Sequence, residues 1–176
     1  MEVIEKNMWD YLGIADVICI TSNGFVKSSG RAVMGRGCAL EAKNRFKDID
    51  LALGYHIEEY GNVPGIIHKY GKTNIVSFPV KRISLIYDNL TENKLVGHMK
   101  KRFKLGDRVP GWALKAELLI IELSARLLRS MIDRNKWETV IITKPGCMNG
   151  ELNWEDVEPI LDMYLKDKVI CVEKIK

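Results

Sequence analysis

The sequence predicts an α/β protein of three layers, in which a mixed, mostly parallel sheet of six strands lies between helices. Short β-branched and apolar segments alternate along the chain with longer segments of helical periodicity. Two of the strands also lead through a glycine-rich loop into a helix, as strands of parallel sheets do. The chain has 176 residues, 47% of them apolar and 28% charged, which suits a single domain with a sizeable core.

The expected elements follow from these patterns in chain order. Strands are predicted where β-branched and apolar residues concentrate, at residues 2–6, 15–21, 66–70, 74–80, 138–143 and 168–173. Helices are predicted at residues 38–46, 51–60, 112–133 and 156–165. Residues 81–111 show no clear periodicity, so we expect a long irregular excursion that serves as a lid, a partner surface or a family-specific addition.

Composition and charge exclude several classes of protein. The net charge of +4 permits an anionic ligand but is too small to imply nucleic acid by itself. The first ten residues lack the apolar stretch of a secretory signal, and the apolar segment 112–132 contains five charged residues, which argues against a membrane span. Four separated cysteines and three scattered histidines predict reduced thiols, a cytoplasmic location and no metal or other cofactor. Nothing in the sequence indicates an oligomer, so we expect a monomer.

The first glycine-rich loop runs from Asn23 to Gly37, between a predicted strand and a helix. A helix N-terminus offers unpaired N–H groups and the positive end of a dipole, and glycines let phosphate oxygens approach the backbone. The Gly-Lys-Ser/Thr ending of a Walker loop is missing, and residues 35–40 (GRGCAL) lack the third glycine of a dinucleotide fingerprint. The loop is therefore either a tight turn or a site for a phosphate-bearing small molecule bound by main chain.

A second glycine-rich loop favours the ligand interpretation. Residues 144–154 (KPGCMNGELNW) follow the predicted strand 138–143 and precede the predicted helix 156–165. Because the carboxyl ends of parallel strands meet at one edge of a sheet, the two loops are expected to form two walls of one cleft.

Three ordered motifs resemble those of the macro domain, an ADP-ribose-binding family. Asn23 with residues 30–39 (GRAVMGRGCA) resembles the first phosphate loop of that family, and residues 145–154 (PGCMNGELNW) resemble the second. Residues 78–81 (FPVK) resemble the F-P-x-K motif of the branch with terminal ADP-ribose protein glycohydrolases and DNA ADP-ribosyl glycohydrolases. The insert in the first loop and residues 111–120 (GWALKAELLI) resemble the bacteriophage-like members most.

The resemblance implies that ADP-ribose, or an ADP-ribosylated substrate, is the partner. It implies hydrolysis of ADP-ribosyl conjugates or of ADP-ribose 1″-phosphate, with Lys81 as the catalytic residue at the distal ribose. Asp10, with Asp16 as the alternative, is expected at the adenine, and Asn23 at the distal ribose. The main chain of both loops is expected to bind the diphosphate and the distal ribose, through Val33, Met34, Gly35, Arg36, Gly37, Gly146, Cys147, Met148, Asn149 and Gly150. A non-catalytic ADP-ribose reader and a nucleic-acid-binding module are the alternatives.

Two features separate these alternatives. Where the protein glycohydrolases of this branch have an Asp in the second loop, this chain has Gly150, followed by Glu151, so it is closer to the DNA type. The basic run Lys100, Lys101, Arg102 and Lys104 is either a solvated face or a contact to phosphates of a nucleic acid or of an ADP-ribosylated substrate.

Overall fold

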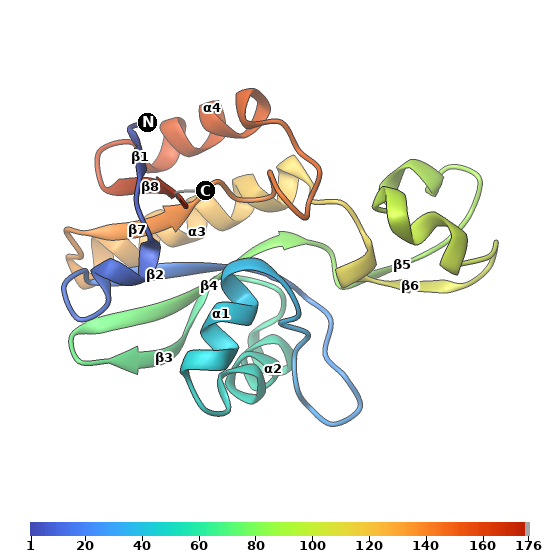
Figure 1. Ribbon diagram of the computed structural model, residues 1–176, viewed down its shortest axis with the longest axis horizontal. Coiled ribbons are helices and arrows are strands. Elements are labelled where there is room, and N and C mark those ends of the chain that lie inside the picture. Colours follow the sequence, from blue (N-terminus) through green and yellow to red (C-terminus); the bar gives the residue numbers. More distant parts are fainter. Residues whose placement is uncertain (175–176) are drawn as a thin grey trace.

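The central feature is a six-stranded sheet between two pairs of helices (Figure 1), in a computed structural model that describes residues 1–174. The strand order is β1-β8-β7-β2-β4-β3, and only the pair β3–β4 is antiparallel. The predicted fold class is thereby confirmed. The strands of this sheet are β1 (Val3–Glu5), β2 (Val17–Asn23), β3 (Gly65–Tyr70), β4 (Thr73–Lys81), β7 (Val140–Thr143) and β8 (Val169–Glu173).

The helices cover the two faces of the sheet in pairs. Figure 1 shows α3 (Leu118–Asn135) and α4 (Trp154–Leu165) on one face, with α1 (Gly37–Arg45) and α2 (Ile49–Tyr60) on the other. Each face has its own core, one around Phe78 and Leu128 and the other around Ile18 and Leu53. Within residues 1–174, no helix is long and apolar enough to cross a membrane.

The predicted helix 112–133 begins later than expected, at Leu118. Glu117 has an extended backbone, with φ −129° and ψ 131°. The backbone N–H groups of Ala116 and Glu117 donate to the carbonyls of Gly150 and Val80, each at 2.9 Å. These bonds hold residues 116–117 extended across the ends of β4 and the second glycine-rich loop, so tertiary contacts override helix propensity here. The ends of the other predicted elements agree with the structure to within two residues.

Residues 82–117, which we term the side lobe, are folded rather than irregular. The strands β5 (Ser84–Ile86) and β6 (Arg108–Pro110) pair antiparallel, and Figure 1 shows this unit projecting from the end of the main sheet. Three short 3₁₀ helices complete it: η2 (Glu92–Lys94), η3 (Gly97–Arg102) and η4 (Gly111–Ala113). The lobe has its own apolar core, which consists of Leu85, Leu95, Val96, Met99, Val109, Ala113 and Leu114.

An ion pair between Arg82 and Glu117 joins the two chain segments that connect the lobe to the main domain. The Arg82 guanidinium donates two hydrogen bonds to the Glu117 carboxylate, and the Lys94 amine lies 3.7 Å from the same carboxylate. Hydrogen bonding from Arg82 lowers the pKa of Glu117 and outweighs the opposing effect of burial. Since Arg82 follows β4 directly and Glu117 precedes α3, the pair joins the two points where the chain leaves and re-enters the main domain.

We predict that Glu117→Ala loosens the lobe while the main domain stays folded. The pair is partly exposed, so its loss is expected to cost about 1 kcal/mol, between the values for exposed and buried pairs. In hydrogen-exchange measurements, lobe amides such as Val96 and Tyr87 should then exchange about five-fold faster, while β2 amides stay unchanged. Arg129→Ala, which removes a double ion pair on α3, is the control. Equal acceleration of amide exchange in the lobe in both variants would contradict this role of the Arg82–Glu117 pair.

Candidate functional site

A cavity of about 930 Å³ lies at the carboxyl ends of the parallel strands. Its lining comes from residues at the ends of β2, β4, β7 and β8, from both glycine-rich loops and from the side lobe. Open α/β sheets bind ligands at this edge, and the volume is in the range of pockets for small molecules.

The first wall is the loop between β2 and α1. The side-chain amide of Asn23 donates to the Val33 carbonyl at 2.9 Å, and its oxygen accepts from the Phe25 backbone N–H at 3.2 Å. Asn23 thus ties the loop to the end of β2. The N-cap residue of α1, Arg36, makes no side-chain cap hydrogen bond, so the first N–H groups of the helix are available to bind an anion. Val33, Gly35, Arg36 and Gly37 line the cavity beside Asn23.

The second wall is the loop between β7 and α4, which packs tightly on itself. A Cβ on Gly150 would lie 2.4 Å from the Gly146 carbonyl oxygen and 2.7 Å from the Ala116 Cβ, so only glycine fits there. Gly146 has a φ of +79°, the left-handed region that favours glycine. Gly146, Cys147, Met148, Asn149 and Gly150, all expected at the site, line the cavity.

Asn149 connects the two walls. Its carbonyl accepts a hydrogen bond of 3.0 Å from the Lys81 amine at the end of β4. A Cβ on Gly37 would lie 3.6 Å from the Asn149 side-chain nitrogen, so this side chain also reaches the first loop. The two loops therefore approach each other at Asn149, and Lys81 lies beside this point.

Lys81 is in an unusual environment for an amine. Its side chain lines the cavity, but only 8% of the residue is exposed. Burial lowers the pKa of the amine to about 8; the charge of Glu151 opposes this shift and that of Arg36 adds to it. Burial therefore makes the neutral, nucleophilic form of this amine more accessible than that of an exposed lysine.

Two predicted site residues are not brought to the cavity. Met34 is buried in the core beside α1 and α2. Asp10 is an exposed residue of the 3₁₀ helix η1 (Met8–Tyr11) and does not line the cavity. Asn7 and Met8 line it instead. Asparagine is favoured at the N-cap of a helix, and this preference could have pointed to Asn7 in the sequence. Its side chain accepts from the Trp9 backbone N–H at 3.1 Å at the start of η1.

The cavity lining also includes residues that were not predicted from the sequence. One is Glu41 on α1, which accepts from the Trp9 indole N–H at 2.6 Å and pairs with the Lys174 amine at 2.9 Å. The side lobe also contributes to the lining. The lobe residues that do so are Val96, His98, Met99 and Trp112.

Glu151, the acidic residue next to Gly150, is turned toward the lobe. Its carboxylate accepts from the Gly97 backbone N–H at 2.9 Å and lies 3.1 Å from the Lys115 amine. The Gly97 hydrogen bond lowers the pKa of Glu151 most, with Lys115 adding to the shift. Glu151 holds the lobe against the second loop and does not line the cavity. In the part of the chain that the structure describes, no three His, Cys, Asp or Glu residues are grouped to hold a metal ion.

Comparison with solved structures identifies the fold. No protein-family model and no curated protein matches the chain. The macrodomain of Mycobacterium tuberculosis DarG is similar in structure, with 20% identity, a TM-score of 0.66, and coverage of 99% of this chain and 98% of that one. The macrodomain of Thermus aquaticus DarG has 17% identity, a TM-score of 0.68, and coverage of 98% and 97%.

A third similar structure is Thermosipho africanus DarTG in complex with ADP-ribose. It has 16% identity and a TM-score of 0.66, and the match covers 99% of this chain and 41% of that one. Together with the strand order, these similarities show that the chain has the macrodomain fold.

Proposed function

We propose that the protein binds ADP-ribose in the cavity and hydrolyses the bond between C1″ of the distal ribose and a conjugated group, with Lys81 acting at C1″. The observation that carries the proposal is the buried Lys81 amine, whose pKa is near 8, at the point where both glycine-rich loops meet. The Thermosipho africanus structure, which contains ADP-ribose, supports the choice of ligand.

The arrangement of the walls supports one orientation of the ligand. The diphosphate fits between the two loops, because the uncapped start of α1 and the main chain of residues 146–150 face the cavity there. The distal ribose then lies toward Lys81. The adenosine lies toward Asn7 and Met8, where the Asn7 amide can donate to or accept from an adenine edge. Asn7 takes the place that the sequence assigned to Asp10.

The Lys81 amine can act as a nucleophile in this orientation. Its nitrogen bonds to C1″ while the bond from C1″ to the leaving group breaks; the leaving group keeps the bonding electrons and receives the proton that the amine loses. The ribose ring then opens to give a Schiff base between C1″ and the amine, and water hydrolyses this carbon–nitrogen bond to release ADP-ribose and the free amine. As a protonated cation, Lys81 instead orients the leaving group and stabilises its charge.

Glu151 points toward the lobe, so no carboxylate of the second loop lines the cavity. A conjugate whose cleavage needs no carboxylate from this loop is therefore the better substrate. We therefore favour DNA-type conjugates over protein conjugates and over ADP-ribose 1″-phosphate. A non-catalytic reader is the second candidate, because the Lys81 amine is engaged by the Asn149 carbonyl.

The first prediction from this proposed function is that ADP-ribose stabilises the protein against heat. Ligand at about 100 times its dissociation constant should add about 2.7 kcal/mol to the free energy of unfolding. AMP, which lacks the distal ribose and one phosphate, should stabilise less, and NAD serves as a further control. Differential scanning fluorimetry measures all three. No shift at millimolar ADP-ribose would contradict the proposed site.

The second prediction concerns Lys81→Ala and Lys81→Arg. Both should lose turnover of an ADP-ribosylated oligonucleotide by at least about 100-fold while ADP-ribose still binds, because the amine acts at the reacting carbon and the main chain binds the diphosphate. Mass spectrometry after borohydride treatment of the wild type should detect ADP-ribose on Lys81 if the amine is the nucleophile. Full activity of Lys81→Ala would exclude this mechanism. Undetectable wild-type turnover with tight ADP-ribose binding would support the reader.

The third prediction is the pH dependence of kcat/KM. A nucleophilic Lys81 must be neutral, so kcat/KM should rise with pH and level off above about 8, the pKa of the amine in the free protein. If Lys81 acts as a cation, kcat/KM should instead fall through the same pH. The profile should be recorded between pH 6 and 9.5 at constant ionic strength. An activity independent of pH throughout this range would argue against either role.

A further inference from the structure

The cleavage proposed above requires a group that moves protons, and no carboxylate of the second loop lines the cavity to do so. Attack by the Lys81 amine releases a proton, and the leaving atom needs one. The carboxylates that do line the cavity are Glu41, Glu155 and Glu173, from α1, α4 and β8. None of them follows β4 or belongs to the lobe, and in the strand order β8 is separated from β4 by β7 and β2.

We propose that His98 of the side lobe is the proton-transfer residue of this reaction. The inference rests on the proposed function, because it assigns to His98 a step of the cleavage at C1″. An imidazole both accepts and donates a proton readily near neutral pH, and this suits a group that must do both within one turnover. Lys81 and His98 then act from two different segments of the chain, one as the nucleophile and the other as the proton carrier.

His98 lies on the side of the cavity where β4 ends. It is the second residue of η3 in the lobe, and the lobe follows β4 directly. His98 and Lys81 line the same cavity. Unlike Lys81, His98 is exposed, so its ring is accessible to a ligand and to water. The two residues thus combine a buried amine with an accessible imidazole in one site.

The carboxylate of Glu151 acts on both groups. It accepts from the backbone N–H of Gly97, the residue before His98, at 2.9 Å. This hydrogen bond lowers the pKa of Glu151 most, and the charges of Lys115 and His98 add to the shift. The charge of Glu151 in turn opposes the effect of burial on the pKa of the Lys81 amine. Glu151 is therefore within electrostatic reach of both the imidazole and the amine.

The second loop joins the two groups by a short path. The Lys81 amine donates to the Asn149 carbonyl at 3.0 Å, and Glu151, two residues further on, holds the start of η3. Two residues of chain span at most about 7 Å. The Lys115 amine, 3.1 Å from the Glu151 carboxylate, keeps this carboxylate turned toward the lobe. Glu151 is thus a positioning residue, which fixes the helix that carries His98 beside the loop that binds the amine.

Protons move through His98 in both halves of the reaction. As the Lys81 nitrogen bonds to C1″, the neutral imidazole takes the proton that the amine loses. It passes this proton to the leaving atom, which departs with the electrons of its bond to C1″. The imidazole then takes one proton from the water whose oxygen bonds to C1″ of the Schiff base. Both protons of that water end on the Lys81 nitrogen, which also keeps the electrons of the broken carbon–nitrogen bond.

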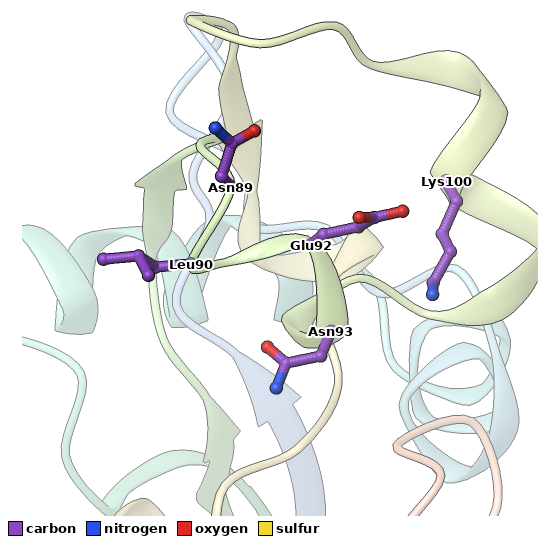
Figure 2. A pocket seen from close by; sticks show the side chains of 5 residues that line it. All are labelled: Asn89, Leu90, Glu92, Asn93 and Lys100. Atoms are coloured by element: carbon purple, nitrogen blue, oxygen red, sulfur yellow. The ribbon is translucent and has the colours of Figure 1, made fainter.

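Lys100 provides a control residue in the same short helix. It is exposed like His98, but it lines a separate pocket of about 450 Å³ together with Glu92 and Asn93. Figure 2 shows these three side chains at that pocket, and no residue that lines it also lines the main cavity. A substitution of Lys100 therefore alters η3 without changing the lining of the site.

The first test measures release of the leaving group in a single turnover at saturating enzyme. One substrate is an ADP-ribosylated oligonucleotide, whose leaving atom needs a proton; the other carries p-nitrophenol on C1″, which leaves as a stable anion. His98→Gln should slow release from the oligonucleotide about 100-fold, the low end for general acid–base catalysis, and release of p-nitrophenol less than about five-fold. Lys100→Ala should change neither rate. Equal slowing of both substrates, or of neither, would overturn the role of His98 in the attack.

The second test follows the covalent intermediate on Lys81. If His98 takes a proton from the attacking water, its loss should prolong the life of the Schiff base. Borohydride treatment during turnover of the p-nitrophenol conjugate should therefore trap at least about five-fold more ADP-ribose on Lys81 in His98→Gln than in the wild type. Lys100→Ala should trap the wild-type amount. An unchanged amount in His98→Gln would overturn its role in hydrolysis of the Schiff base.

The positioning role of Glu151 is tested by a conservative variant. Glu151→Ala removes the acceptor of the Gly97 N–H and should slow release from the oligonucleotide about ten-fold, again with little effect on p-nitrophenol. Glu151→Gln keeps an acceptor oxygen and should recover most of this loss. Equal rates for Glu151→Ala and the wild type would contradict the placement of His98 by this carboxylate.

The inference and the proposed function fail separately in these experiments. If Lys81→Ala loses turnover while His98→Gln keeps it on both substrates, the role of His98 is disproved and that of Lys81 stands. If the wild type releases no leaving group from either conjugate, both proposals fail.

Discussion

The arrangement of the site depends on the ion pair between Arg82 and Glu117. Each partner is adjacent in sequence to a residue that the cavity requires: Lys81 precedes Arg82, and Ala116, which supports Gly150, precedes Glu117. The backbone of Glu117 also donates to Val80 at the end of β4. One charge pair and two main-chain hydrogen bonds thus hold the amine, the second loop and the side lobe in a fixed relation. A partly buried bidentate pair is well suited to this, because its geometry is as specific as its energy.

The cavity itself depends mostly on main chain. Gly150 packs against Gly146 and Ala116 at distances that no side chain allows, and Asn23 ties the first loop to β2 through its amide. Such a site requires glycine at a few positions and tolerates most residues elsewhere. This agrees with the retention of the macrodomain fold at 16% to 20% identity. Lys81 is the exception, because its burial, rather than its main chain, gives it a pKa near 8.

The sequence predicted what depends on local pattern and failed where tertiary contacts decide. The sheet and the helices were predicted because their periodicity extends over enough residues, and the two loops because glycines mark them. The lobe was expected to be irregular because its elements span only three to six residues, too few to show a period. The early helix start at residue 112 was wrong because Ala116 and Glu117 donate to distant carbonyls. Asp10 was expected at the adenine because the resemblance implies an Asp near this point and a carboxylate suits an adenine amino group, but the 3₁₀ helix at residues 8–11 leaves Asp10 exposed and outside the cavity lining.

The separation of the cores has a consequence for specificity. The lobe core, from Leu85 to Leu114, is distinct from the two cores that pack on the sheet. Its residues can therefore change without disturbing the strands that position Lys81 and the two loops. The two glycine-rich loops and the strand ends form one part of the cavity lining, whereas the lobe forms another part from a separately packed segment. A fold organised in this way can change the chemistry of one part of a cavity without changing the packing of the rest.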